Sequence, residues 1–156
     1  MLKLIRSMAH LDVEQLLSVY AESNAKSGQL RKGEDTFLSY LREDFFTEKD
    51  TVYAVWSDGN AYLSALRLEP YKDGFLIAGL ETAPNVRRQG YAFSLLSGVI
   101  AHLRESGCGA VYSHVKKNNT VSISIHRKSG FQTISDTATL LDGTVTTAYT
   151  TMCYRI

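Results

Sequence analysis

The sequence has few of the features that mark a specialised class of protein. It holds two cysteines and two prolines among 156 residues, and no apolar run is long enough to span a membrane. The apolar stretch of residues 1–5 is also too short for the core of a signal peptide. Cys108 and Cys153 lie far apart and match no metal-binding spacing. We therefore expect reduced thiols, no metal site, no membrane attachment and a cytoplasmic location.

Neither sign of charge prevails in the composition. The chain has 17 Lys and Arg against 16 Asp and Glu, which gives a formal net charge of +1. A protein that binds duplex DNA usually carries a clear basic excess, so we expect no nucleic-acid partner. Apolar residues at 44% and charged residues at 21% are ordinary for a globular protein. The length fits a single domain, residues 1–156, with a core of its own.

The sequence does contain a clear succession of strand and helix periodicities. Strands are predicted over residues 2–6, 51–56, 61–70, 75–82, 110–115, 131–140 and 144–156. Helices are predicted over residues 12–23, from about Glu34 to Phe45, from Tyr91 to a stop at Gly107, and over 119–128, with breaks at Ser27-Gly28 and Lys32-Gly33. The order β-α-α-β-β-β-α-β-α-β-β predicts an α/β domain built on one mixed sheet. Residues 75–82 are almost continuously apolar, so we expect that strand to be covered on both faces.

The loop between strand 75–82 and the helix that starts at Tyr91 has the character of an anion-binding site. Free N–H groups in the first turn of a helix, together with the positive end of its dipole, favour an anion there. Gly90 and Ala92 leave little side-chain bulk, and Arg87 and Arg88 add donors and charge. The signatures Gly-Lys-Ser/Thr and GxGxxG are absent, which argues against the usual nucleotide loops. We predict a phosphate or pyrophosphate cradle; an ordinary turn with solvated arginines is the alternative.

Two motifs give the chain a family resemblance. The stretch Arg87-Arg88-Gln89-Gly90-Tyr91-Ala92 resembles the Gln/Arg-x-x-Gly-x-Gly/Ala acyl-CoA pyrophosphate loop of the GCN5-related N-acetyltransferase (GNAT) superfamily. Residues 119–131 resemble a second element of that superfamily, with matches at Asn119, Ser122, Lys128, Gly130 and Phe131. The resemblance implies a mostly antiparallel sheet of about seven strands with about four helices on both faces. It also implies an N-acetyltransferase that moves an acetyl group from acetyl-CoA to a primary amine, of a small molecule or a peptide, by direct attack in a ternary complex. A homodimer is left open.

The resemblance further implies which residues hold acetyl-CoA (coenzyme A). The end of strand 75–82 would pair with the pantetheine arm, the loop and the start of the next helix would bind the pyrophosphate, and helix 119–128 would hold the cofactor from the other side. The residues are Leu80, Glu81, Thr82, Arg87, Arg88, Gln89, Gly90, Tyr91, Ala92, Phe93, Asn119 and Ser122. For Asn119, a role as helix cap is an alternative, and both roles can apply. Lys116 and Lys117 are candidates for the ribose phosphate, unless they are ordinary surface lysines.

Acetyl transfer to an amine depends mainly on a base. A lysine-like amine with a pKa of about 10.4 costs roughly 4–5 kcal/mol to deprotonate at pH 7, whereas a thiolate with a pKa of about 8.5 is disfavoured by only about 2 kcal/mol. We predict His114, at the end of strand 110–115, as the base, because a pKa near 6.5 suits neutral pH. Glu81 is the second candidate for the base. Glu69 and Glu81 both stand at strand ends near the expected cleft, where they can attract a cationic amine or relay its proton through water; a solvated rim is the alternative. A histidine that is merely hydrogen-bonded at a strand end is the alternative for His114.

His126 stands where the family usually has a tyrosine that protonates the departing thiolate. Neutral histidine can donate one hydrogen bond, so His126 is predicted as the acid, with cofactor contact or packing as alternatives. Tyr112 shares a strand face with His114 and is a reserve donor. The unusual residue at 126 keeps a second function open, an acyl-CoA-binding sensor without turnover. Residues expected to shape the acceptor pocket are Asp44, Phe45, Phe46 and Tyr71.

Overall fold

The computed structural model describes residues 1–156 and contains five α-helices and nine strands. In chain order these are β1 (Leu2–Ile5), α1 (Val13–Val19), α2 (Ala21–Ala25), α3 (Leu30–Glu43), β2 (Val52–Ser57), β3 (Tyr62–Tyr71), β4 (Gly74–Thr82), α4 (Tyr91–Glu105), β5 (Ala110–Lys116), α5 (Thr120–Lys128), β6 (Gln132–Ser135), β7 (Ala138–Thr139), β8 (Val145–Thr146) and β9 (Tyr149–Arg155). Short 3₁₀ helices occupy Met8–His10, Phe45–Thr47 and Pro84–Val86. None of the helices combines the length and apolar character that a bilayer-spanning segment needs.

Seven strands form one sheet in the order β1-β2-β3-β4-β5-β9-β6, and β7 and β8 form a separate hairpin. Every neighbouring pair in the large sheet is antiparallel except β4 and β5, which run parallel. This confirms the predicted α/β class and the mixed, mostly antiparallel sheet. The parallel pair follows from the crossover: α4 carries the chain back over one face of the sheet before β5 begins.

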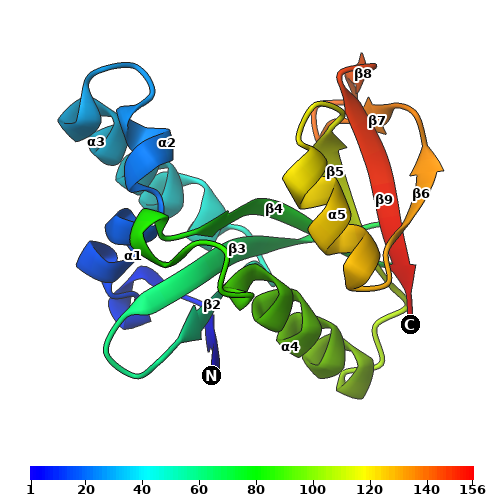
Figure 1. Cartoon of the computed structure of the whole chain (residues 1–156), viewed down its shortest axis with the longest axis horizontal. Helices are drawn as coiled ribbons and strands as arrows, with labels where there is room; N and C mark the ends of the chain where they lie inside the picture. Colours follow the sequence, from blue (N-terminus) through cyan, green and yellow to red (C-terminus); the bar gives the residue numbers. More distant parts are fainter.

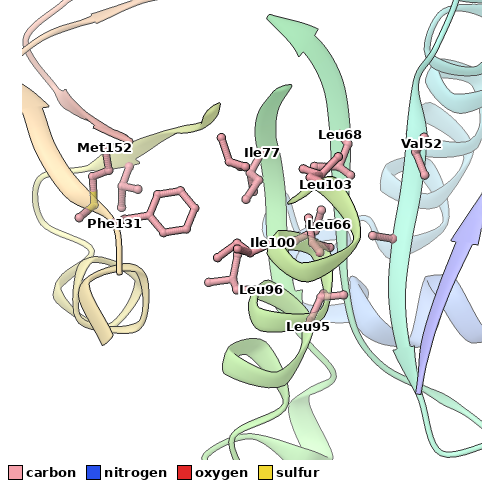
Figure 2. Packing of buried hydrophobic residues seen from close by; sticks show 14 residues of the cluster. Val52, Leu66, Leu68, Ile77, Leu95, Leu96, Ile100, Leu103, Phe131 and Met152 are labelled. Atoms are coloured by element: carbon pink, nitrogen blue, oxygen red, sulfur yellow. The ribbon is translucent and has the colours of Figure 1, made fainter. Parts of the chain in front are cut away.

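The face covered by α4 and α5 holds the largest core cluster. Leu95, Leu96 and Ile100 of α4 recur at helical spacing and point toward Leu66 and Ile77 on the strands, as Figure 2 shows. Each fully buried side chain of this kind contributes about 1.5–3 kcal/mol through the hydrophobic effect. Figure 2 also shows Phe131 and Met152 closing this cluster on the side of α5 and β9.

The opposite face is covered by α1–α3, which gather over the half of the sheet that contains β2, β3 and β4 (Figure 1). Its core is built around Tyr53, which is fully buried and meets the rings of Tyr20 and Phe45 at 6.3 and 5.7 Å between centroids. Phe45 is only 2% exposed. The expectation that Phe45 shapes an acceptor pocket is therefore wrong, because its ring fills the core.

Two helix predictions differ from the structure. The predicted helix 12–23 is divided at Tyr20, whose φ and ψ of −96° and 15° separate α1 from α2, so the chain has five helices rather than about four. The predicted break at Lys32-Gly33 is wrong, because α3 begins at Leu30 and runs through both residues. A Cβ at Gly33 would lie 2.1 Å from the carbonyl oxygen of Asn24, so this glycine allows α2 and α3 to approach closely.

Three strand predictions also need correction. Along β4 only Leu76 and Ile77 are buried, so this strand is not covered on both faces throughout its length. The predicted strands 131–140 and 144–156 are each divided, into β6 with β7 and into β8 with β9. The first division lies at residues 136–137, where the Ser135 hydroxyl accepts a hydrogen bond from the backbone N–H of Thr137 and turns the chain.

Candidate active site

The central feature of the site is the separation of β4 from β5. Their parallel pairing ends at Ile77 and Ser113, although β4 continues to Thr82 and β5 to Lys116. Figure 1 shows the two strands diverging beyond this point. The last residues of β4 therefore have no β5 partner, and their backbone on that side is free to bind a ligand.

A bulge in β4 accompanies the separation. Between the pairs Ala65–Glu81 and Arg67–Ala78, the chain advances three residues along β4 but two along β3. Gly79 in this bulge has a φ of +62°, a conformation that favours glycine. The hydroxyl of Tyr20 donates a hydrogen bond of 2.5 Å to the carbonyl of Gly79, which ties the bulge to the N-terminal helices. A bulge bends its strand, so it helps to turn the end of β4 away from β5.

A large cleft lies where the strands separate, with a volume of about 720 Å³. Eleven of the twelve residues predicted to hold acetyl-CoA line it, namely Leu80, Glu81, Thr82, Arg87, Arg88, Gly90, Tyr91, Ala92, Phe93, Asn119 and Ser122. The twelfth, Gln89, does not line it; its side-chain oxygen accepts a hydrogen bond from the Tyr91 hydroxyl. Residues that the sequence did not indicate for this cleft are Glu22, Ser23, Lys26, Val121, Ile125 and Lys128. Of these, only Lys128 carried a signal, as a member of the second motif.

The start of α4 forms one end of this cleft. Gly90 is the N-cap residue, with a φ of +86° and no side-chain hydrogen bond to the first turn. The N–H groups of that turn are therefore available to a ligand, and the positive end of the helix dipole lies beside them. Arg88 has a φ of +64° and is exposed. Arg87 instead forms a 2.5 Å ion pair with Glu22 and so links the loop to α2.

The start of α5 forms the opposite wall. The side chain of Asn119 accepts a hydrogen bond of 3.1 Å from the backbone N–H of Ser122, so Asn119 caps the helix and also lines the cleft. The ammonium of Lys128 lies 4.9 Å from the centroid of the Phe93 ring, which brings α5 and α4 together across the cleft. Cationic side chains thus occupy both walls of a cavity with free helix amides at one end.

A second, smaller pocket of about 170 Å³ lies between β4 and β5. Both predicted catalytic histidines line it, together with residues 77–80. The Nε2 atoms of His114 and His126 are buried and have no hydrogen-bond partner. Two unpartnered imidazole nitrogens that border one pocket are unusual, because buried polar atoms normally find a partner.

His126 is 1% exposed and is held in a defined tautomer. Its Nδ1 lies 2.7 Å from the carbonyl oxygen of Ser122, which can only accept a hydrogen bond, so Nδ1 carries the hydrogen. Nε2 of the neutral ring is consequently a lone-pair acceptor. Burial lowers the pKa of His126 below its ordinary value, although the hydrogen bond to the Ser122 carbonyl works in the opposite direction. Near neutral pH, this residue therefore presents an acceptor to the pocket and not a donor.

His114 lies on β5, and its ring meets the ring of Tyr71 edge to face at 5.8 Å between centroids. Burial, followed by the charge of Lys72, lowers the pKa of His114 below its ordinary value. The imidazole is thus neutral near pH 7 and able to accept a proton. Tyr112 shares the strand, but its hydroxyl donates a 2.6 Å hydrogen bond to Asp73 and it lines neither pocket. Its use as a reserve donor is disfavoured for that reason.

Glu81 points toward α2, where its carboxylate accepts a hydrogen bond from the hydroxyl of Ser23. Burial raises the pKa of Glu81, and the hydrogen bond and nearby cations only partly oppose this. Glu69 lies on the neighbouring strand β3, and its carboxylate accepts a 3.3 Å hydrogen bond from the hydroxyl of Tyr40.

Of the remaining candidates, Lys116 lines the smaller pocket, with its ammonium 5.9 Å from the Tyr149 ring centroid, whereas Lys117 lines neither pocket. Asp44 and Phe46 line neither pocket either; Asp44 is exposed and Phe46 packs against Phe45.

The chain is similar to known proteins in both sequence and fold. The model of the Acetyltransferase (GNAT) family matches residues 13–131. The GCN5-related N-acetyltransferase 6, chloroplastic, of Arabidopsis thaliana is 41% identical over 58 residues, which are 37% of this chain and 20% of that protein. The chain thus matches about a fifth of the length of this curated relative.

Solved structures show the same fold across the whole chain. The PaiA N-acetyltransferase of Thermoplasma acidophilum, in complex with coenzyme A, has a TM-score of 0.71 at 14% identity and covers 100% of this chain and 99% of its own. The ribosomal-protein-S18-alanine N-acetyltransferase of Escherichia coli has a TM-score of 0.67 at 17% identity, with 100% and 94% covered. The family match includes both motifs and confirms the resemblance that they indicated: the chain belongs to the Acetyltransferase (GNAT) family.

Proposed function

We propose that the chain is an N-acetyltransferase that moves an acetyl group from acetyl-CoA to the primary amine of a small molecule or a protein. The observation that carries this proposal is the cleft between the separated ends of β4 and β5, which leads from the uncapped first turn of α4 to a pocket with two free imidazole nitrogens. Family membership supports the same reaction and the same acyl donor. The amine attacks the thioester directly while both substrates are bound.

The residues present fit acetyl-CoA. The amides after Gly90 suit a pyrophosphate, because they are unpartnered and a side chain at Gly90 would meet nothing within 4 Å. The unpaired backbone of residues 80–82 suits the amides of the pantetheine arm, and Asn119 and Ser122 border the same cleft. When bound, acetyl-CoA supplies the reactive acetyl thioester. An N–H at the end of β4 is suited to stabilise the negative charge that develops on its carbonyl oxygen.

We assign His114 as the base. Its Nε2 is buried and unpartnered, the residue lines the smaller pocket, and its lowered pKa keeps it neutral and ready to accept a proton at pH 7. Glu81 is the alternative base, since its raised pKa and position in the cleft also suit proton transfer. His126 acts as an acceptor in the resting enzyme, in place of the acid that its position first suggested. An acid is not essential, because the thiolate is disfavoured by only about 2 kcal/mol at pH 7.

A second candidate function is an acyl-CoA-binding sensor without turnover. The observation that favours it is the tautomer of His126, which leaves no donor at Nε2 toward a leaving group. Two measurements separate the candidates. Acetyl-CoA should raise the melting temperature in both cases, whereas release of free CoA with a panel of amines should occur only with the enzyme. No thermal shift at saturating acetyl-CoA would contradict both functions.

We also propose that residues 1–156 act as one acyl-CoA-binding domain, which is supported by core clusters that pack on the two faces of one sheet. A reducing compartment such as the cytoplasm is supported by the free thiols of Cys108 and Cys153.

A homodimer is supported by the open edge of β6, where Ile134 is 54% exposed. Light scattering coupled to gel filtration tests the last point, and a monomer mass would refute it.

A further inference from the structure

Arg67 is a charged residue in the middle of β3 whose Nε atom has no hydrogen-bond partner. The neighbouring Leu66 and Leu68 point into the α4 core, so Arg67 lies on the face covered by α1–α3. Its side chain is 19% exposed, and its Nε is buried with no hydrogen-bond partner. The nearest carboxylate oxygen, Oε1 of Glu69, lies 4.0 Å from Nε, which is beyond hydrogen-bonding distance. A guanidinium has five N–H donors, and a carboxylate at this distance leaves the Nε donor unsatisfied, which is costly for a buried group.

The guanidinium of Arg67 lies directly against the bulge of β4. A Cβ placed on Gly79 would be 3.1, 3.2 and 3.3 Å from its Nη1, Cζ and Nη2 atoms, so the plane of the guanidinium faces the glycine. Gly79 is exposed and precedes residues 80–82, the strand end at which we place the acetyl thioester. The ring of Tyr40 lies on another side, 5.3 Å from Cζ. Arg67 is therefore fixed next to the point of transfer, on the side of the sheet opposite α4 and α5.

Both signs of charge are present around this point. Glu69 is 13% exposed and lies on the same strand face as Arg67, and Glu81 follows the bulge on β4. An acceptor with only an amine would be attracted by these carboxylates but would leave the Nε of Arg67 without a hydrogen-bond acceptor. An acceptor with a carboxylate beside the amine would satisfy both, because guanidinium and carboxylate form charge-assisted, often bidentate hydrogen bonds.

We propose that Arg67 binds a carboxylate of the acceptor, so that the acceptors of this chain are amino acids or related compounds with a carboxylate next to the reacting amine. This inference rests on the proposed acetyltransferase function and specifies its substrate class. The amine and the carboxylate belong to one small unit, since Arg67 touches the bulge that leads into the transfer site. Arg67 is a specificity-determining residue and takes no part in bond making.

The test compares α-amino acids with their α-carboxamides, which differ at the carboxylate alone. CoA release is measured for each pair, and rates are referred to the free-base form of each amine, because the amide has the lower amine pKa. We expect kcat/KM to favour the acids by on the order of tenfold to a hundredfold, the range expected for hydrogen bonds to a charged group. In Arg67→Gln this preference should disappear through a higher KM for the acids, whereas Arg67→Lys should retain part of it. Arg42→Gln, an exposed arginine on α3, is the control and should keep the full preference.

A binding measurement separates this inference from the proposed function. With CoA bound, which cannot donate an acetyl group, the acids should raise the melting temperature and the amides should not. Equal rates and equal thermal shifts for acids and amides would overturn the role of Arg67 while acetyl transfer stands. If no amine causes CoA release, acetyl transfer fails, and the thermal shifts alone decide whether Arg67 recognises a carboxylate. If Arg67→Gln does not fold, the comparison of acids and amides in the native chain still decides whether the site recognises a carboxylate beside the amine.

Discussion

Replacement of Gly90 by leucine should remove acetyl-CoA binding and leave the fold intact. A Cβ at Gly90 would meet no atom within 4 Å, so the side chain can be accommodated without a clash in the free protein. It would, however, project from the N-cap of α4 into the space where the pyrophosphate is expected. The cost to stability comes from the φ of +86°, which non-glycine residues adopt at roughly 1–2 kcal/mol.

The structure provides a matched control at the other end of the same helix. Gly107 has a φ of +74°, and a Cβ added there would also have nothing within 4 Å, but this residue lies outside the cleft. Gly90→Leu and Gly107→Leu should therefore lose similar stability, about 2–8 °C in melting temperature for a chain of this size. Acetyl-CoA at about a hundred times its Kd should stabilise a binding-competent protein by about 2.7 kcal/mol, or about 5–10 °C.

The expected result is an undiminished ligand-induced shift in Gly107→Leu and no shift in Gly90→Leu. Differential scanning fluorimetry measures both effects, and calorimetric titration measures the affinity directly. A Gly90→Leu protein that still binds acetyl-CoA with native affinity would refute the assignment of the α4 amides to the pyrophosphate. Loss of binding in both variants would show that strain at either end of α4, and not obstruction at Gly90, is responsible.

Three single side chains give further predictions. Burial lowers the pKa of His126, so the folded state resists protonation and stability is lost as the pH falls below about 6.5. Between about pH 7.5 and pH 5.5 the melting temperature should therefore fall less in His126→Asn than in the native chain or in the control His10→Asn, and equal falls would contradict this. Asn119→Ala should lower the free energy of unfolding by about 1 kcal/mol through loss of the α5 cap, as Asp12→Ala should through loss of the α1 cap. Asn119→Asp should keep the cap and weaken acetyl-CoA binding by placing negative charge in the cleft, and an unchanged affinity in calorimetry would limit this residue to capping. His114→Ala should lower kcat/KM by a factor of about 10²–10⁴ and remove the acid limb of the pH profile of kcat/KM, which lies below about pH 6.5 because burial lowers the pKa of His114. An unchanged pH profile would exclude His114 as the base.

The parts of the cleft that depend on local chain chemistry could be predicted from the sequence. Gly90 takes a positive φ at a helix start, and Asn119 caps the helix that it precedes, so short motifs identify both positions. The residues that α2 contributes could not be predicted in this way. Glu22 and Ser23 reach the cleft because α2 packs close to α3, and that approach depends on Gly33, a residue whose pattern indicated a break instead.

The sequence around Arg67 contains a signal of its position on the strand. Residues 66–69 alternate between leucine and a charged residue, which is typical of a strand with one apolar face and one face that carries polar side chains. In an interior strand of a seven-stranded sheet, such charges are largely buried and require partners. Alternation therefore predicts that Arg67 and Glu69 share a face, but only the structure shows that the Gly79 bulge lies against Arg67, next to the proposed site of transfer.

The role of His126 depends on a hydrogen atom whose position no sequence pattern specifies. A tyrosine at this place would always carry a hydroxyl hydrogen, whereas a neutral histidine has one N–H for two nitrogens. In α5 the carbonyl of Ser122, four residues earlier, takes that N–H at Nδ1 and leaves Nε2 as an acceptor toward the pocket. The same ring therefore changes from a predicted acid to an acceptor through one helix carbonyl. In the proposed mechanism, transfer then depends on the base and on the low cost of a free thiolate, and not on a donor to the leaving group.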